Sequence, residues 1–297
     1  MIRHRFLRCA NYTIHLREAG TQGRPVVLLL HGFSQNGGAF LPLMRAMATT
    51  HHLIAPDMPG RGLSQWARDA AAEYDFPRFI AVVEQLLEQL DISELSIVGT
   101  SMGGSMGIHM AAGSLRGRVQ ALVLNDMGME LPSAALDAAL ADRDMHPKFE
   151  NFQDFRAYLT DVYVRLSKAE LSNAEWTEFC MTSCRRADDG QYTIHHDPKI
   201  FTHFEVNKRD FALTDAFRTL ACPITLLHAG RSGILTTTQV SDMAKLQPRL
   251  VVNKFPSKGH PLFLTEPTEI RSVQEALAER LSFGDEAIYQ IRGGLNE

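Results

Sequence analysis

A single serine flanked by glycines lies at residues 99–103, where the chain reads Gly-Thr-Ser-Met-Gly. A short apolar run precedes it, and a run of small residues follows it. This G-x-S-x-G spacing is typical of a sharp strand-to-helix turn that exposes one hydroxyl above a sheet. Glycine is expected at Gly99 and Gly103 because a Cβ there would clash with nearby backbone. Ser101 is therefore the predicted nucleophile.

A serine hydroxyl is a poor nucleophile at neutral pH and needs an adjacent base, which a third group must orient. The chain holds 12 histidines. We expect the base to be His260, in Ser-Lys-Gly-His-Pro, because it follows the last strong strand signal. Chemistry in open α/β sheets gathers at the carboxyl ends of the strands.

Acyl transfer also needs N–H donors for the negative charge that develops on the carbonyl oxygen. One expected donor is the backbone N–H of Met102, directly after the nucleophile. The other is the backbone N–H of Phe33, in the loop His31-Gly32-Phe33 that follows an apolar run at 26–30. We expect His31 to shape this loop through hydrogen bonds rather than to transfer protons.

The elements that would position these residues alternate along the chain. Strands are expected at 12–18, 26–30, 52–55, 95–98, 119–124, 223–228 and 250–255, and helices at 39–48, 76–90, 101–113, 237–246 and 267–282. Such alternation predicts an α/β fold, with a mostly parallel central sheet and helices on both faces. The alternation of strand and helix patterns stops over residues 127–219. This interruption predicts a mainly helical cap, here called the insert. Residues 1–126 and 220–297 would form the core. Aromatic residues of the insert are expected mainly to pack, and together to roof an apolar pocket.

Composition narrows the class of protein. With 297 residues and 45% hydrophobic content, the chain is long enough for one large domain. Its net charge of −4 gives no excess of basic residues for binding nucleic acid or an anionic membrane. The first residues are charged without an apolar stretch, so a secretory signal is not expected. Four scattered cysteines predict reduced thiols in the cytoplasm. The sequence leaves the oligomeric state open, a homodimer included.

No metal or cofactor is expected. The triplet His195-His196-Asp197 could suggest metal ligands, but it lacks a third ligand at regular spacing, so a loop or surface role is preferred.

Taken together, these motifs resemble the α/β-hydrolase superfamily. The matching pieces are His-Gly-Phe at 31–33, Asp-Met-Pro-Gly-Arg-Gly-Leu-Ser at 57–64, Gly-Thr-Ser-Met-Gly-Gly at 99–104, and Gly-His at 259–260. The segment at 57–64 looks like the D-x-P-G-x-G-x-S turn of that superfamily, with Arg61 where histidine is common. We interpret this turn as structural, with Asp57 bonding local backbone.

The resemblance also exposes a departure. Many members carry their triad acid just after the strand expected here at 223–228, and this chain has Gly233 at that place. Asp126, at the end of the strand after the nucleophile helix, is the predicted substitute. The alternative is that Asp126 only turns the chain into the insert. Asp215 and Asp242 are weaker candidates for the acid.

The predicted function is that of a cofactor-free serine hydrolase. It would cleave an ester, thioester, lactone or amide of a small, partly apolar molecule through an acyl-enzyme. Three alternatives stay open: hydrolysis of a carbon–carbon bond, cofactor-free dioxygenation, and ligand binding by a relative with vestigial catalysis. The resemblance argues against dehalogenase and epoxide-hydrolase chemistry, because those relatives carry a carboxylate nucleophile where this chain has serine.

Overall fold

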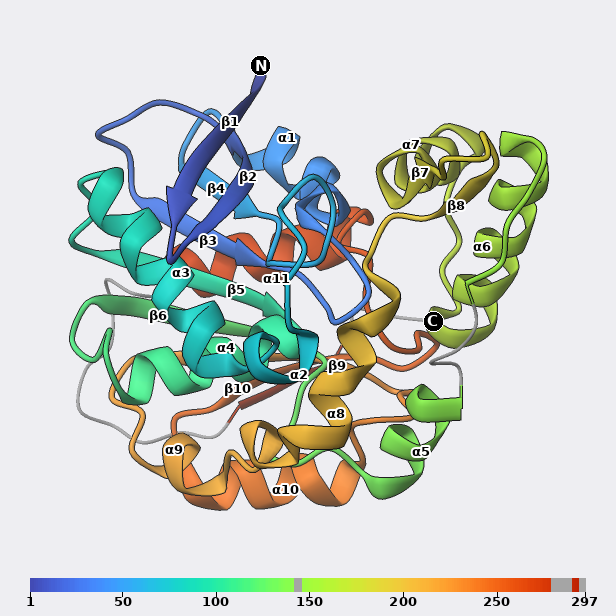
Figure 1. The fold of residues 1–297 in the computed structure, drawn as a ribbon. Coiled ribbons are helices and arrows are strands. Elements are labelled where there is room, and N and C mark those ends of the chain that lie inside the picture. The colour runs from blue at the N-terminus through green and yellow to red at the C-terminus, as the bar shows by residue number, and fades with distance from the viewer. Residues whose placement is uncertain (142–145, 279–289, 294–297) are drawn as a thin grey trace.

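The computed structural model describes residues 1–141, 146–278 and 290–293. Within them, a sheet of nine strands runs in the order β1-β2-β4-β3-β5-β6-β9-β10-β11 (Figure 1). Its strands are β1 (Ile2–Cys9), β2 (Tyr12–Ala19), β3 (Val26–Leu30), β4 (His52–Pro56), β5 (Leu95–Thr100), β6 (Val119–Asn125), β9 (Ile224–Ala229), β10 (Val251–Phe255) and β11 (Gln290–Gly293). β2 pairs antiparallel with β1 and β4, and all other pairings in this sheet are parallel.

Helices connect these strands. The core holds η1 (Gly37–Phe40), α1 (Leu41–Met47), α2 (Ala70–Glu73), α3 (Phe76–Gln89), α4 (Met102–Ala112), α10 (Thr237–Leu246) and α11 (Pro267–Ala278). The expected helix at 39–48 begins instead as a 3-10 turn that Asn36 caps through its side chain, and it continues as α1. For the helix expected at 267–282, residues 279–282 lie outside the described residues.

Side chains of the central strands alternate between the two faces of the sheet, as the pleat requires. In β3, Leu28 and Leu30 belong to one buried cluster, whereas Val27 and Leu29 belong to another. The first cluster continues into α3, α4 and α10, and the second into α1 and α11. Helices therefore cover both faces of a mostly parallel sheet, as predicted.

Strand β1 has no counterpart among the sequence predictions. It pairs along its whole length with β2 at the edge of the sheet, and most of its residues are exposed or half-buried. Its arginines suit an edge strand, where charge discourages pairing with another chain. The same charges removed the apolar alternation that would have predicted a strand.

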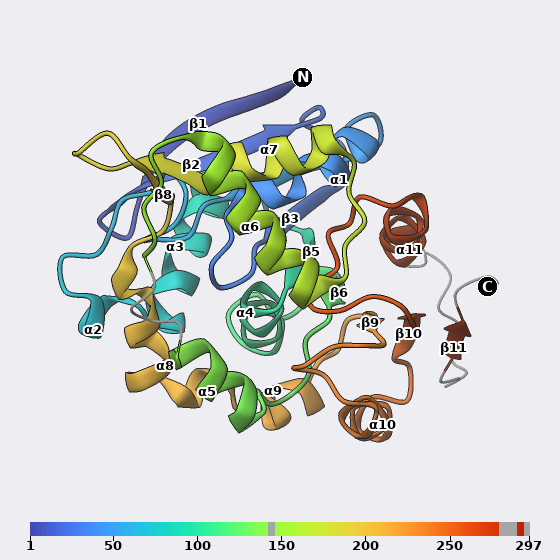
Figure 2. The same ribbon diagram turned by 90° about the vertical axis from the view of Figure 1, so that its right-hand side faces the viewer.

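The insert lies between β6 and β9 in the chain, with α5, α6 and α7 at the right in Figure 1 and α9 at the lower left. It contains α5 (Ser133–Ala141), α6 (Phe152–Ser167), α7 (Asn173–Ser183), β7 (Cys184–Arg186), β8 (Tyr192–Ile194), η2 (Pro198–Phe201), α8 (Thr202–Val206), η3 (Lys208–Phe211) and α9 (Thr214–Arg218). Figure 2 turns the side that carries α6 and α7 toward the viewer, so that both helices stand in front of the sheet.

The two halves of the insert pack differently. Aromatic residues of α6 and α7, such as Phe155 and Trp176, form a cluster of their own with Phe263. Phe204, in α8, and Phe217, in α9, instead join the large cluster beside the sheet. The aromatic residues therefore pack, as expected, and the division of the chain into two domains at 126 and 220 stays a prediction.

In the portion of the chain that the structure describes, no helix combines the length and the apolar character that crossing a bilayer requires.

Candidate active site

Ser101 occupies the turn between β5 and α4 with a left-handed backbone, at φ 49° and ψ −115°. Such strain in a non-glycine residue is usually found at functional sites. Two glycines make the turn feasible: a Cβ on Gly99 would lie 2.5 Å from the carbonyl carbon of Gly103, and a Cβ on Gly103 would lie 2.0 Å from Leu30 O. The close approaches predicted from the sequence are therefore present.

His260 and Asp126 lie side by side. Asp126 Oδ2 is 2.9 Å from His260 Nδ1, and Asp126 Oδ1 accepts the backbone N–H of Ala229 at 2.9 Å. The Asp126 side chain is fully buried, and that of His260 is 21% exposed. Because a carboxylate can only accept, Nδ1 carries the proton, and the Nε2 atom of neutral His260 has a free lone pair.

A cavity of about 470 Å³ holds both Ser101 and His260 in its wall. Gly32 and Phe33 line it from the loop after β3, and the insert contributes mainly apolar side chains. The insert residues are Leu131, Ala135, Tyr158, Leu159, Val162, Tyr163, Arg165, Leu166, Ser183, Ile194, His196, Phe201 and Phe204. This composition suits a small, largely apolar ligand held against a few polar groups.

The other acids weighed from the sequence lie elsewhere. Asp215 pairs with Arg218, and Asp242 pairs with Lys245, in each case within one surface helix. Gly233 lines the cavity, and a Cβ added there would meet nothing within 4 Å. Among the acids considered, Asp126 is the one that contacts His260.

Phe33 lines the cavity from the loop after β3, and Met102 directly follows Ser101 in the chain. Met102 is the first residue of α4, and the first N–H groups of a helix have no acceptor within the helix. His31 Nδ1 donates to Gly32 O at 2.7 Å, and His31 Nε2 accepts the N–H of Met58 at 3.0 Å. Burial lowers the pKa of His31 to about 4. Both of its nitrogens are engaged, so this histidine shapes the loop, as expected.

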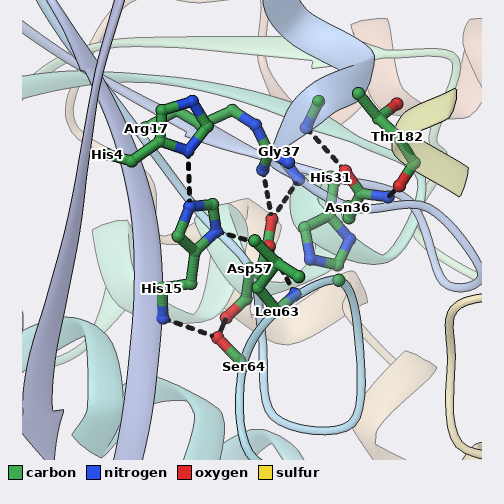
Figure 3. Close-up of polar contacts among 12 residues, drawn as sticks. His4, His15, Arg17, His31, Asn36, Gly37, Asp57, Leu63, Ser64 and Thr182 are labelled. Atoms are coloured by element: carbon green, nitrogen blue, oxygen red, sulfur yellow. Dashed lines mark hydrogen bonds and ion pairs between the residues drawn. The ribbon is translucent and has the colours of Figure 1, made fainter. Parts of the chain in front are cut away.

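The turn at 57–64 is held by Asp57, which is fully buried (Figure 3). Its carboxylate accepts from His15 Nδ1 at 2.7 Å, from Arg17 at 2.7 Å and from the N–H groups of Gly37 and Leu63 at 2.8 and 2.9 Å. Ser64 closes the turn by donating to Asp57 O at 2.6 Å. Asp57 therefore bonds local backbone, as expected, and it also bonds the side chains of His15 and Arg17 from β2.

The triplet at 195–197 was expected to have a loop or surface role. Its three residues are buried, so the expected surface role is wrong. His195 Nδ1 accepts the N–H of Gly62 at 2.7 Å, and Asp197 accepts from Tyr74 Oη at 2.7 Å. The first bond attaches the insert to the turn at 57–64, and the second attaches it to Tyr74, directly after α2. His196 lines the cavity. Among the described residues, no group of three or more His, Cys, Asp or Glu side chains is arranged to hold a metal.

Two residues near the site were not singled out from the sequence. Asn125 Nδ2 donates to Thr100 Oγ1 at 3.0 Å and to Leu262 O at 2.9 Å, so its amide connects the segments that carry Ser101 and His260. Tyr163 lies near the Ser34 and Gln35 side chains, and burial raises the pKa of Tyr163 to about 12. No sequence pattern marks either residue, because both contacts join distant segments.

Residues 25–267 match the family model of the alpha/beta hydrolase fold, and the chain belongs to this family. It is 24% identical to the 3-hydroxybutyrate-oligomer hydrolase of Cupriavidus necator over 279 residues, which cover 89% of this chain and 94% of that protein. It is 25% identical to the 2-(acetamidomethylene)succinate hydrolase of Mesorhizobium japonicum, over 84% of this chain and 85% of that protein. A crystal structure of an alpha/beta hydrolase from Novosphingobium aromaticivorans superposes with a TM-score of 0.83 at 26% identity, covering 94% and 99% of the two chains. The protein is thus a hydrolase built on this fold.

Proposed function

We propose that the protein is a serine hydrolase that cleaves carboxylic esters of small, partly apolar acids through an acyl-enzyme. Ser101 is the nucleophile, His260 the base, Asp126 the acid, and the N–H groups of Phe33 and Met102 are the oxyanion donors. The observation that carries the proposal is the 2.9 Å contact between Asp126 Oδ2 and His260 Nδ1, beside a cavity that Ser101 also lines.

We expect the reaction to proceed in two halves. His260 Nε2 takes the Ser101 proton as Oγ attacks the ester carbonyl carbon, and the carbonyl oxygen gains the charge that the two N–H groups receive. His260 then gives the proton to the leaving alkoxide as the C–O bond breaks. A water molecule repeats the sequence on the acyl group and frees Ser101. Asp126 holds the ring orientation and stabilises the imidazolium formed in each half.

The apolar wall of the cavity favours a short acyl or alkyl group on the substrate. The relative that acts on 3-hydroxybutyrate oligomers is similar over nearly its whole length. Short 3-hydroxyacid esters are therefore the natural first substrates. Thioesters, lactones and amides share the same acyl chemistry and belong in the same comparison.

The experiment uses p-nitrophenyl butyrate and a methyl-capped 3-hydroxybutyrate dimer, with Ser101→Ala and a matched control. Ser105→Ala is that control, because Ser105 lies one turn later on α4 and its buried Oγ has no hydrogen-bond partner among the described residues. We expect S101A to lose at least about 10³-fold in kcat and S105A to stay within about twofold. Mass spectrometry of the quenched wild type should locate the acyl group on Ser101. Unchanged turnover by S101A would refute the proposal.

A further inference from the structure

The side chain of Arg61 is an unusual group for the interior of this protein. Its residue is 0% exposed, and among the described residues no carboxylate lies within ion-pair distance of it. A buried charge without a partner is costly, so its retention calls for compensating contacts. Burial lowers the pKa of Arg61 to about 10, which leaves the guanidinium charged at neutral pH.

The compensation comes from carbonyls and aromatic rings, and from the charge of Asp197 at a distance longer than an ion pair. Arg61 Nε donates to Phe33 O at 3.0 Å, and a terminal nitrogen donates to Pro59 O at 2.9 Å. The guanidinium carbon lies 5.0 Å from the ring centroid of Phe33, 5.5 Å from that of Tyr74 and 5.3 Å from that of Phe79. Three aromatic faces thus surround the cation at distances where their quadrupoles attract it.

Two of the contacts of Arg61 are with the residues whose backbone N–H groups are the proposed oxyanion donors, at the Phe33 carbonyl and at the Met102 side chain. Arg61 bonds the carbonyl of Phe33, and its other terminal nitrogen lies 3.8 Å from Met102 Sδ. Phe33 lies in the loop after β3, and Met102 is the first residue of α4, directly after the turn that follows β5. The Phe33 ring also stacks on Phe204 of the insert, with centroids 4.1 Å apart. Phe33 therefore contacts both Arg61 and Phe204, and Phe204 also lines the cavity.

We propose that Arg61 is a positioning residue for the oxyanion hole: it holds the Phe33 backbone against the Met102 side chain and places a desolvated positive charge beside them. The inference rests on the proposed function. Charge that develops on the substrate oxygen in a low-dielectric site feels such a cation more strongly than in water. The resting substrate carries no such charge, so Arg61 stabilises the transition state more than the bound ester.

The test compares Arg61→Met, Arg61→Lys and the exposed control Arg249→Met. R61M keeps the volume and removes the charge, and R61K keeps the charge but cannot bond Phe33 O and Met102 Sδ together. We expect R61M to lose roughly 10- to 100-fold in kcat with KM changed less than threefold, since an indirect support should cost less than a lost donor. R61K should lie between R61M and wild type, and R249M should match wild type.

A second measurement separates this role from simple support of the fold. A trifluoromethyl ketone forms an anionic hemiketal with a catalytic serine. The control compound is the secondary alcohol with the same chain and a methyl group in place of the trifluoromethyl group, which stays neutral when bound. R61M should weaken inhibition by the ketone in proportion to its loss of kcat and leave binding of the alcohol within twofold. Circular dichroism establishes that each variant is folded. If R61M does not fold, the same test is made with R61K. We then expect R61K to lower both kcat and the affinity for the ketone at least threefold.

A folded R61M, or R61K in its place, with kcat and ketone inhibition within twofold of wild type would overturn the inference. Equal losses of affinity for the ketone and the alcohol would also overturn it, because they would indicate a general distortion of the cavity. Failure of the proposed function looks different: wild-type protein would then not be labelled at Ser101 by a fluorophosphonate and would not turn over any ester.

Discussion

Asp126 Oδ2 lies 2.9 Å from His260 Nδ1, a contact between residues 134 positions apart in the chain. The carboxylate is anchored on its other side, where Oδ1 accepts the N–H of Ala229. Asp126 itself has a positive φ of 52°, the conformation that turns the chain out of β6. The residue therefore does both things that were weighed from the sequence: it turns the chain and it faces the histidine.

Asp126→Asn should lower kcat by about 10⁴-fold, because an amide next to Nδ1 favours the wrong tautomer and cannot stabilise an imidazolium. Asp242→Asn, a surface acid on α10, is the control and should leave kcat unchanged. Steady-state hydrolysis of p-nitrophenyl butyrate measures both variants. A folded D126N within tenfold of wild type would mean that another group supports His260.

Gly233→Asp should partly rescue D126N. Position 233 lines the same cavity as His260 and has open space for a side chain, so a carboxylate there could approach the imidazole from the neighbouring strand end. We expect kcat/KM of the double variant to rise roughly tenfold above that of D126N. Gly233→Asn in the same background supplies the size without the charge and should give no gain. Equal values for the two double variants would contradict this prediction.

Asp57→Asn should destabilise the fold by about 3 kcal/mol, since it leaves buried His15 and Arg17 without their shared anion. Burial alone would raise the pKa of Asp57, but the hydrogen bond from His15 and the charge of Arg17 hold it well below its usual range. A depressed pKa gives stability that is present above the usual value near ~4 and is lost as the pH falls below it. Urea unfolding between pH 3 and 7 should show this loss in wild type and a weaker one in D57N.

Glu269→Gln should change stability at the opposite end of the pH range. Burial, and then the charge of Glu266, raise the pKa of Glu269 to about 7. The folded state therefore holds a proton that the unfolded state releases near pH ~4.5, so wild-type stability should fall by up to ~3 kcal/mol as the pH rises from 5 to 8. E269Q should lack this fall, and Glu275→Gln, exposed on the same helix, should keep it. Parallel curves for wild type and E269Q would show that Glu269 does not titrate in this window.

The sequence alone was enough for most of the sheet and for the elbow at Ser101. Buried strands such as β3 and β5 are continuous apolar runs, and the helices between them carry apolar residues at helical spacing, because burial on two faces or on one face selects those patterns. The motifs at 31–33 and 99–104 are local as well, since glycine is required wherever backbone passes this close.

Tertiary structure decided what depends on contacts between distant segments. Whether Asp126 would face His260, whether Asn125 would connect the segments beside Ser101 and His260, and whether Arg61 would be buried against Phe33 could not be read from spacing. Each contact is fixed by the pairing of β5, β6 and β9 and by the packing of the insert, which bring together residues that no local pattern relates. Local propensity and hydrophobic period determine elements, whereas the geometry of a site is set by how those elements are packed together.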